Sequence, residues 1–207
     1  MIGIVDYGVG NLFSLRSSFA AVGAEVTVSR DSAVLSRCTR LVLPGVGAFS
    51  DAARLLRETG MADLVLREAA AGKPILGICL GMQLLFDKSM EYGEHAGLGL
   101  IPGVVRSIGE TIPRGLKIPE IGWNSLHFVR KNPLFRYVKE GDFVYFVHSY
   151  HGTGCEDSTV AVTDYGAPLC AAVARGNVFG CQFHPEKSGA VGLSILRAFA
   201  EGEVAVC

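Results

Sequence analysis

The sequence has no strongly basic segment. No run of lysine and arginine is longer than two residues, and the formal net charge of the 207-residue chain is −1. Proteins that bind the phosphate backbone of DNA or RNA depend on clusters of positive charge. A chain without such a cluster has no electrostatic driving force for this binding, so we expect no nucleic-acid partner.

Long apolar runs are absent as well. No stretch reaches the about 18 consecutive apolar residues that a membrane-spanning helix needs. The first residues, "MIGIVDYG", lack the basic start and the cleavage site of a signal peptide. Hydrophobic residues make up 49% of the chain and charged residues 19%, which is typical of a globular protein with a large core. We expect a cytoplasmic protein without a membrane partner.

Metal-binding cysteine pairs are also missing. The six cysteines are scattered and form no C-x-x-C pair: Cys38, Cys79, Cys155, Cys170, Cys181 and Cys207. This pattern argues against a zinc site and indicates reduced thiols. His148 and His151 are three residues apart on a predicted strand, so their side chains would point to opposite faces. We therefore expect no metal site.

Strand-like and helical patterns alternate in the first half of the chain. Apolar or alternating stretches at 1–8, 24–29, 40–45 and 73–79 predict strands, and 12–22, 49–60, 61–72 and 80–88 predict helices. Asn11 and Asp31 are expected to cap helices, and Gly23 to end one. This alternation predicts a parallel sheet covered by helices on both faces.

The second half contains mainly strand patterns. They lie at 103–108, 124–130, 142–151, 158–166 and 169–185, and the last includes a hairpin turn at Gly176-Asn177. A final helix is expected at 189–202. Neither a linker nor a repeat divides the chain, so we predict one domain over residues 1–207. Its fold class is α/β, with a mixed, mainly parallel sheet flanked by helices.

A possible nucleophile follows the fourth predicted strand. In "GICLG", Cys79 lies between Gly77 and Gly81, which is the form of a nucleophile elbow at a strand-to-helix turn. The glycines would allow close approach of neighbouring backbone, and the helix N-terminus would favour a thiolate. The alternative is a buried structural cysteine at a glycine-rich strand end.

A nucleophilic cysteine needs a base, because a free thiol is mostly protonated at pH 7. His184 is the best placed of the five histidines, because it ends a predicted strand and Glu186 follows two residues later. A carboxylate there could fix the tautomer of the imidazole. The alternative is a surface His-Pro turn with a solvated glutamate.

Two glycine-rich turns are candidates for ligand contact. The turn at 44–49, "PGVGAF", follows the third predicted strand and could supply one N–H group of an oxyanion hole, with Leu80 N–H as the other. The turn beginning at Gly8 resembles half of a dinucleotide fingerprint, but Phe13 occupies the place of its third glycine. We do not expect a nucleotide there.

Taken together, "PGVGAF", "GICLGMQLLF" and "QFHPEKS" resemble the motifs of the class I (triad) glutamine amidotransferases, in the same order and over the whole chain. The stretches "DYGVGNL", "IGWN", "FVHSY" and Lys187-Ser188 are further similar to the glutaminase subunits of imidazole glycerol phosphate synthase. The chain is thus identified as a glutamine amidotransferase type 1 domain with a nucleophile elbow, and no cofactor is implied.

The resemblance also implies roles for individual residues. Cys79 would be the nucleophile, His184 the general base and acid, and Glu186 the residue that orients the histidine. Further residues are implied in three places: the N–H groups of Val46 and Leu80 in the oxyanion hole; Gly47, Gln83, Ser149 and Tyr150 in the glutamine pocket; and Pro119, Trp123, Asn124 and Lys187 at a partner interface.

The implied partner is a cyclase with a (βα)8 barrel, which would use ammonia from L-glutamine to make imidazole glycerol phosphate in histidine biosynthesis. The chemistry favours a partner too. Ammonia in water at pH 7 becomes non-nucleophilic ammonium, so it must be transferred without contact with bulk water.

Three positions depart from the family pattern. Glu120 stands where a histidine is expected, His151 where an aromatic is usual, and Cys181 where valine is.

Trp123 is the only tryptophan, between a proline-bounded turn and a predicted strand. It is either a core residue or an anchor at the interface, where tryptophan is enriched.

Three other functions of the chain stay open: a glutaminase subunit of another synthase, a scaffold that has lost catalysis, and a cysteine peptidase. "IGWN" and "PEKS" argue against the first, the complete triad against the second, and a need for a partner would argue against the third.

Overall fold

The alternating pattern of the first half builds a parallel sheet in the computed structural model, which describes residues 1–202. Four strands pair in parallel in the order β2-β1-β3-β4: β1 (Ile2–Val5), β2 (Val26–Ser29), β3 (Arg40–Leu43) and β4 (Ile75–Ile78). The helices between them are α1 (Leu12–Ala21), α2 (Ser32–Ser36), α3 (Phe49–Glu58) and α4 (Met61–Ala70). The predicted strands and helices of residues 1–79 are therefore confirmed.

The sheet continues beyond β4 with strands from the end of the chain. β14 pairs in parallel with β4, and the following pairs are antiparallel. The order β4-β14-β13-β12-β9 uses β14 (Val178–Cys181), β13 (Pro168–Arg175), β12 (Thr159–Asp164) and β9 (His127–Phe128). The hairpin between β13 and β14 turns at Gly176-Asn177 as predicted. The expected mixed sheet is thus an eight-stranded one.

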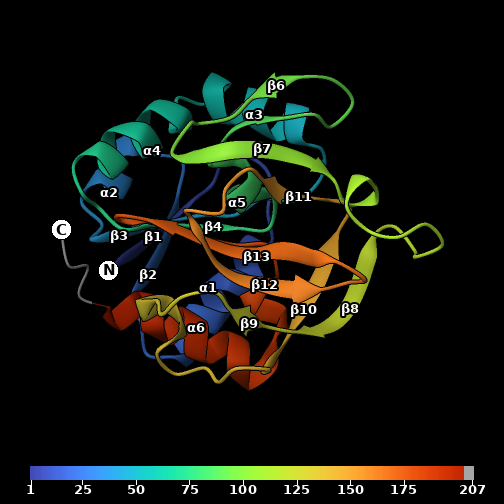
Figure 1. Ribbon diagram of the computed structural model, residues 1–207. Helices are drawn as coiled ribbons and strands as arrows, with labels where there is room; N and C mark the ends of the chain where they lie inside the picture. Colours follow the sequence, from blue (N-terminus) through green and yellow to red (C-terminus); the bar gives the residue numbers. More distant parts are fainter. Residues whose placement is uncertain (203–207) are drawn as a thin grey trace.

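Each face of this sheet is covered by its own core. Along β3, Leu41 and Leu43 pack into one cluster and Val42 into the other, because alternate side chains leave a strand on opposite faces. The cluster on the Val42 side includes α1 and α6 (Gly189–Glu201), and the other includes α2, α3 and α4. Figure 1 shows these groups of helices on opposite sides of the sheet.

Helix ends follow the local sequence signals. Asn11 Oδ1 accepts a hydrogen bond from Ser14 N at 3.4 Å, and Asp31 Oδ1 accepts one from Ala33 N at 2.7 Å. Both side chains satisfy N–H groups that have no partner inside the helix. Gly23, with φ 78°, follows the end of α1. The three predicted helix boundaries are confirmed.

The predicted helix at 80–88 was too long. The helix α5 spans only Leu80–Leu84, and the chain continues as strand β5 (Phe86–Ser89). Backbone groups after the helix bond to a distant segment, as Leu100 N and Ile101 N both donate to Leu85 O at 2.9 Å. This pairing starts an unpredicted four-stranded sheet, β11-β7-β5-β6, with β6 (His95–Ala96), β7 (Ile101–Ser107) and β11 (Tyr150–Thr153).

Two further strand predictions had the wrong limits. The stretch at 142–151 divides at Ser149 into β10 (Phe143–His148) and β11, which belong to different sheets. The stretch at 124–130 contains β9, but its beginning belongs to β8 (Glu120–Ser125), which pairs with β10 in a separate antiparallel sheet. Trp123 therefore lies inside a strand and not in the loop before one. Short 3-10 helices lie at Ile108–Glu110, Pro133–Phe135 and Pro185–Lys187.

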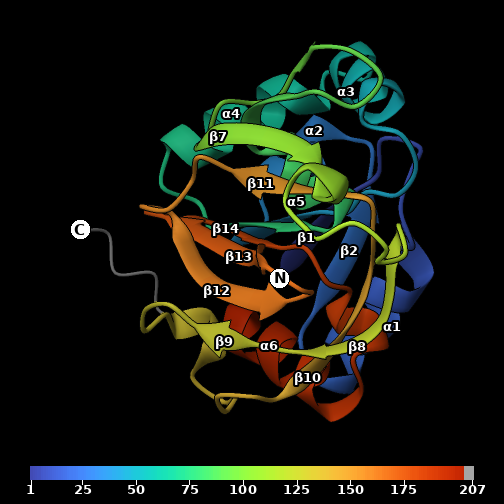
Figure 2. The ribbon, with the colours of Figure 1, turned by 45° about the vertical axis from the view of Figure 1, so that its right-hand side comes forward.

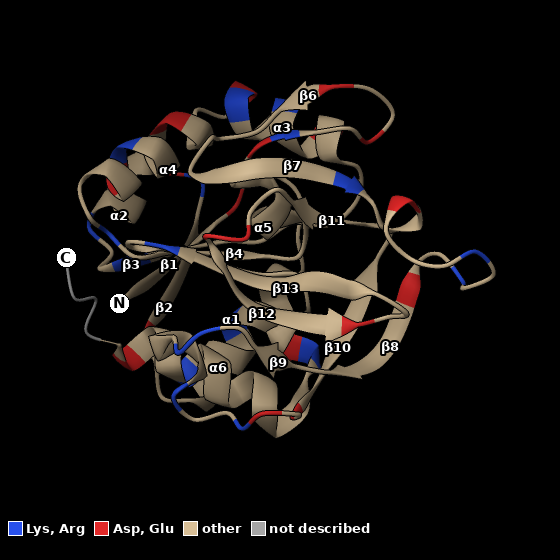
Figure 3. Ribbon diagram, viewed as in Figure 1, with Lys and Arg blue, Asp and Glu red and all other residues tan. Residues whose placement is uncertain are grey.

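Charged side chains of both signs are mixed over the surface. Figure 3 shows Lys and Arg interspersed with Asp and Glu on the helices and loops. The longest helix of residues 1–202 is α6 with 13 residues, and no helix in that range combines the length and the hydropathy needed to cross a membrane.

Candidate active site

Cys79 stands at a strained turn between β4 and α5. Its φ is 54° and its ψ −114°, a backbone conformation that is rare for a residue with a side chain. Such strain persists only where the surroundings hold the backbone in place, and it is concentrated at functional sites. Cys79 N donates to Cys181 O of β14 at 2.8 Å, which fixes the turn against the neighbouring strand. The predicted elbow geometry is present.

The glycines around Cys79 are required by close backbone contacts. A Cβ on Gly81 would lie 1.9 Å from Leu43 O, and one on Gly77 would lie 2.6 Å from Gly81 O. Gly45 has the same constraint, because its Cβ would lie 2.7 Å from Gly81 N. The turn after β3 and the start of α5 therefore touch through backbone atoms, and this contact brings residues 44–47 beside the thiol.

His184 and Glu186 reach the same edge of the sheet from β14. Cys181 pairs with Ile78 across the parallel β4–β14 ladder, so the residues after both strands emerge together. His184 Nδ1 donates to Glu186 Oε1 at 2.8 Å, and both side chains are almost fully buried. Within residues 1–202, the second carboxylate oxygen of Glu186 is buried and has no hydrogen-bond partner. The backbone holds the histidine through His184 N, which donates to Tyr145 O at 2.9 Å.

The charges around His184 favour its protonated form. Burial alone would lower the pKa of this imidazole, but the hydrogen bonds and negative charges of Cys79 and Glu186 outweigh burial and raise the pKa to about 9. Gln182 also contacts the thiol, since its Nε2 donates to Cys79 Sγ at 3.8 Å. The arrangement can therefore hold a thiolate next to an imidazolium.

A cavity of about 580 Å³ opens above the thiol. It is lined by nearly all the residues expected in the catalytic site, oxyanion hole and glutamine pocket: Val46, Gly47, Cys79, Leu80, Gln83, Ser149, Tyr150 and His184. Glu186 is the exception, because it lies behind His184. Tyr7 Oη supports one wall by donating to Pro44 O at 2.7 Å. The structure thus brings together residues from four separate segments of the chain.

Six residues line this cavity that the sequence did not single out for it: Glu91, Tyr92, Ser107, Ile118, Val147 and His148. Glu91 is the most informative of them, because it adds a carboxylate to the wall. Its Oε2 accepts a hydrogen bond from Phe49 N at the start of α3. No motif marks residue 91, since it enters the cavity through the unpredicted turn after β5.

Two of the four residues expected at a partner interface lie at the cavity, one is exposed on β8, and one turns inward. Pro119 and Lys187 line the cavity, and Lys187 Nζ is 6.0 Å from the centre of the Tyr145 ring. Trp123 is 54% exposed, which excludes the core position, and packs edge-on against Tyr145. Asn124 turns inward instead, because its Nδ2 donates to Glu120 Oε1 at 2.9 Å and to Asp164 O at 2.8 Å.

Figure 2 shows the strands β8 and β10 at the edge of the molecule. Trp123 belongs to a group of exposed apolar side chains on and next to these strands. We call this group the apolar rim. Its members are large hydrophobic side chains that are about half exposed: Ile121, Trp123 and Phe143 on the two strands, and Ile118 just before β8. Such a patch beside a cavity is typical of a surface that binds another protein.

The two histidines tested as a metal pair have separate partners. His148 Nε2 is 3.0 Å from Glu120 Oε2, and His151 Nε2 is 2.9 Å from Thr111 Oγ1. Burial lowers the pKa of His151 to about 4. Residues 1–202 contain no group of three or more His, Cys, Asp or Glu side chains placed to hold a metal ion. All five cysteines in this range are free and buried, and Cys207 lies outside it.

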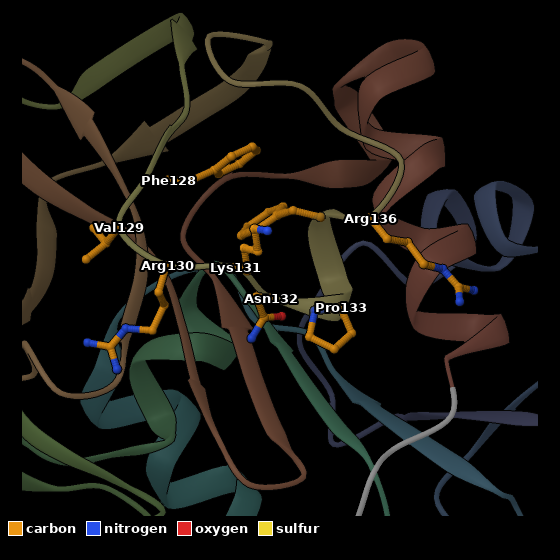
Figure 4. Close-up of a pocket in the computed structure, with 8 residues that line it drawn as sticks. Phe128, Val129, Arg130, Lys131, Asn132, Pro133 and Arg136 are labelled. Atoms are coloured by element: carbon orange, nitrogen blue, oxygen red, sulfur yellow. The ribbon is translucent and has the colours of Figure 1, made fainter.

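A second cavity of about 580 Å³ lies between β9 and the segment that follows it, away from Cys79. Figure 4 shows its lining residues, which are 128–133, Phe135 and Arg136. Two of its three basic side chains have partners, as Arg130 donates to Glu156 O and Asp157 O, and Arg136 donates to Glu201 Oε2. Its lining contains no cysteine, histidine or carboxylate side chain, so it does not share the chemistry of the cavity at Cys79.

Comparison with known proteins gives a consistent picture. Residues 3–201 match the family described as glutamine amidotransferase class-I. The chain is 50% identical over 202 residues to the imidazole glycerol phosphate synthase subunit HisH of Caldanaerobacter subterraneus subsp. tengcongensis, covering 97% of this chain and 98% of that one. It is 52% identical to the same subunit of Geobacillus thermodenitrificans, covering 96% and 94%.

Solved structures with low sequence identity share the fold. A crystal structure of a glutamine amidotransferase superposes with a TM-score of 0.75 at 20% identity, covering 97% of both chains. The structure of PurLQS from Thermotoga maritima contains a chain with a TM-score of 0.75 at 21% identity, covering 96% of both chains. These similarities confirm the predicted fold class, and the sequence relatives confirm the predicted family.

Proposed function

The chain belongs to the class-I glutamine amidotransferases and, among these, to the HisH glutaminase subunits of imidazole glycerol phosphate synthase; we propose that it hydrolyses L-glutamine through a thioester on Cys79. The observation that carries the mechanism is the placement of a strained cysteine and a His–Glu pair on adjacent parallel strands at one cavity. A structural cysteine needs neither the strain nor the paired histidine.

In the first half of the reaction, the Cys79 thiolate attacks the carboxamide carbon of glutamine. The carbonyl oxygen becomes an oxyanion, for which the N–H groups of Val46 and Leu80 are the proposed donors. The His184 imidazolium then gives its proton to the nitrogen as the C–N bond breaks, releasing ammonia and leaving a glutamyl thioester. Glu186 holds the imidazole so that Nε2 is directed at the reacting atoms.

In the second half, His184 takes a proton from water, and the hydroxide formed attacks the thioester. Breaking of the C–S bond releases glutamate and regenerates the thiolate. Gly47, Gln83, Ser149 and Tyr150 are proposed to hold glutamine during both halves, since all four line the cavity. Glu91 is suited to bind the α-ammonium group, because it places a carboxylate in the same wall.

We further propose that the ammonia passes to a cyclase subunit with a (βα)8 barrel. That subunit would form imidazole glycerol phosphate, with aminoimidazole carboxamide ribonucleotide as by-product, for histidine biosynthesis in the cytoplasm. The apolar rim, together with Pro119 and Lys187, supports a docking surface at the cavity mouth. Docking there would close the cavity and keep the ammonia from bulk water, where it would be protonated.

The test is glutamate production by the purified chain, alone and with the cyclase and its nucleotide ligand. We expect slow hydrolysis by the single chain and a rise in kcat, with a smaller change in KM, when the partner is added. Closure would complete an interaction that is made only in the transition state. Absence of hydrolysis under all conditions would indicate a scaffold, and full activity without partner would indicate a stand-alone amidase.

Replacing Trp123 with alanine should weaken binding to the cyclase by about 2 kcal/mol, or roughly thirtyfold in Kd. The free chain should keep its Tm, because the ring is 54% exposed and its removal creates little cavity. Titration calorimetry and thermal unfolding separate these effects. A large loss of Tm with unchanged affinity would contradict the interface role. Leu66→Ala, at an exposed apolar residue on α4, is the matched control.

The rate of glutamine hydrolysis should fall above about pH 9, because the His184 imidazolium that protonates the leaving nitrogen is lost as the pH rises through its pKa of about 9. Glu186→Gln removes a negative charge that raises this pKa. The alkaline limb of kcat/KM should therefore move to lower pH in this variant. A limb that stays in place would show that another group controls it.

A further inference from the structure

Glu120 is a buried carboxylate close to the glutamine cavity. Only 3% of the residue is exposed, although its neighbours Ile121 and Trp123 on β8 point outward. Both carboxylate oxygens have partners within the chain: Oε1 accepts from Asn124 Nδ2 at 2.9 Å, and Oε2 lies 3.0 Å from His148 Nε2. A carboxylate loses its hydration when it is buried, so it needs such partners.

His148 connects this carboxylate to the cavity wall. It lies opposite Glu120 in the β8–β10 ladder, lines the cavity and is 5% exposed. Its Nδ1 is 2.9 Å from Tyr150 O. A carbonyl oxygen can only accept, so Nδ1 carries the hydrogen in this bond. A carboxylate oxygen also only accepts, so the ring of His148 joins the Glu120 carboxylate to the backbone of Tyr150 by donating from both of its nitrogens.

The Tyr150 carbonyl accepts a second hydrogen bond from inside the cavity. Gln83 Nε2 donates to it at 3.1 Å and also donates to Gln182 Oε1 at 2.9 Å. The Tyr150 peptide is thus held from one side by α5 and from the other by His148. Tyr150 is the first residue of β11, where the chain changes sheets, and it pairs with Ser107 at the end of the β11–β7 ladder.

We propose that Glu120 is a positioning residue for glutamine binding, which orients His148 so that its Nδ1–H holds the Tyr150 carbonyl and shapes the wall formed by Ser149 and Tyr150. This inference rests on the proposed function, because it takes the cavity as the glutamine site. Glu120 itself does not line the cavity and acts through the imidazole.

The geometry separates the role of the charge from the role of the hydrogen bonds. In Glu120→Gln, the amide oxygen can accept from Asn124 while the amide nitrogen donates to His148 Nε2, which leaves the hydrogen on Nδ1. The carbonyl contact is then retained without a negative charge. In Glu120→Ala and Glu120→Leu no partner for Nε2 remains, and the imidazole is free to turn away from Tyr150.

Glutamine binding to the single chain, whose hydrolysis we expect to be slow, can be measured by protection of Cys79 from iodoacetamide. The glutamine concentration for half-protection should rise about tenfold or more in Glu120→Ala and Glu120→Leu, and change less than about threefold in Glu120→Gln. The alkylation rate without glutamine should match the wild type in every variant, because the thiol and His184 are unchanged. KM should follow the half-protection concentration, and kcat should change less.

The matched control is Glu68→Ala. Glu68 is also a buried carboxylate, 8% exposed and 2.6 Å from Lys73 Nζ, but it lies on α4 away from the cavity. It should lose stability while glutamine protects Cys79 as in the wild type. Equal protection in Glu120→Leu and wild type, or a loss in Glu120→Gln as large as in Glu120→Leu, would overturn the proposal.

Two outcomes keep the proposals distinguishable. If glutamine fails to protect Cys79 in the wild type, the proposed function is wrong, and the inference about Glu120 falls with it. If glutamine protects the wild type and protects all Glu120 variants equally, only the positioning role is wrong. Should Glu120→Ala not fold, Glu120→Leu supplies the same test, because it fills the volume of the side chain without an acceptor.

Discussion

Replacing Cys79 with alanine is expected to reduce glutamine hydrolysis by about 10⁴-fold or more, which is the scale of removing the nucleophile from a catalytic triad. The thioester cannot form without the sulfur of Cys79, and His184 alone cannot replace this nucleophile. The variant should still fold, because the thiol faces the cavity and its loss leaves the glycine contacts of the elbow in place. Release of glutamate, followed over time, measures the loss.

The same variant also tests whether glutamine hydrolysis by this chain and product formation by the cyclase are separate reactions. Bound to the cyclase, it should still support product formation from added ammonium salt at high pH, where free ammonia is present. Cys38→Ala is the matched control, since Cys38 is also a buried thiol but does not line the cavity. Glutamine-dependent turnover that survives in Cys79→Ala, or is lost in Cys38→Ala, would refute the assignment of the nucleophile.

Replacing Gly81 with alanine should have the largest effect on folding. The added Cβ would lie 1.9 Å from Leu43 O and 2.8 Å from Leu43 C, and backbone atoms of a central strand cannot move aside. Overpacking of a core usually costs 1–3 kcal/mol, and here we expect about 3 kcal/mol or more because no side chain can rotate away. Chemical denaturation measures the free energy of unfolding.

Gly72→Ala is the appropriate comparison. Gly72 has φ 84° and no atom within 4 Å of its added Cβ, so only the conformational penalty of about 1 kcal/mol applies. If Gly81→Ala were as stable as Gly72→Ala, the elbow would have to be more adaptable than its contacts indicate. Any folded fraction of Gly81→Ala should also lose glutamine hydrolysis, because the turn at 44–47 and the thiol would move apart.

The sequence was sufficient for the parts of the site that depend on local pattern. Cys79 between two glycines predicted the turn, and the position of His184 at a strand end predicted where its side chain would emerge. Both depend on strand and turn rules that act over a few residues. The parallel alternation of the first half then determined that the ends of these strands meet at one edge.

Features that depend on contacts between distant segments were not predictable. Residues 86–89 form a strand because β7, which follows more than ten residues later, supplies their partners, although the local pattern favoured a helix. The inward direction of Glu120 depends on the register of β8 against β10, which the sequence alone does not give. A glutamate next to exposed hydrophobic residues would ordinarily be assigned to the surface.

The register of β4 against β14 places His184 next to Cys79, so catalytic activity depends on correct pairing of these two strands. A shift of one residue between these strands would displace His184 by about 3.3 Å relative to Cys79, more than a hydrogen bond tolerates. Chains with native-like secondary structure but a slipped sheet should therefore be inactive rather than partly active. Specific activity then measures the fraction of correctly paired molecules, which spectroscopic measures of helix and strand content would overestimate.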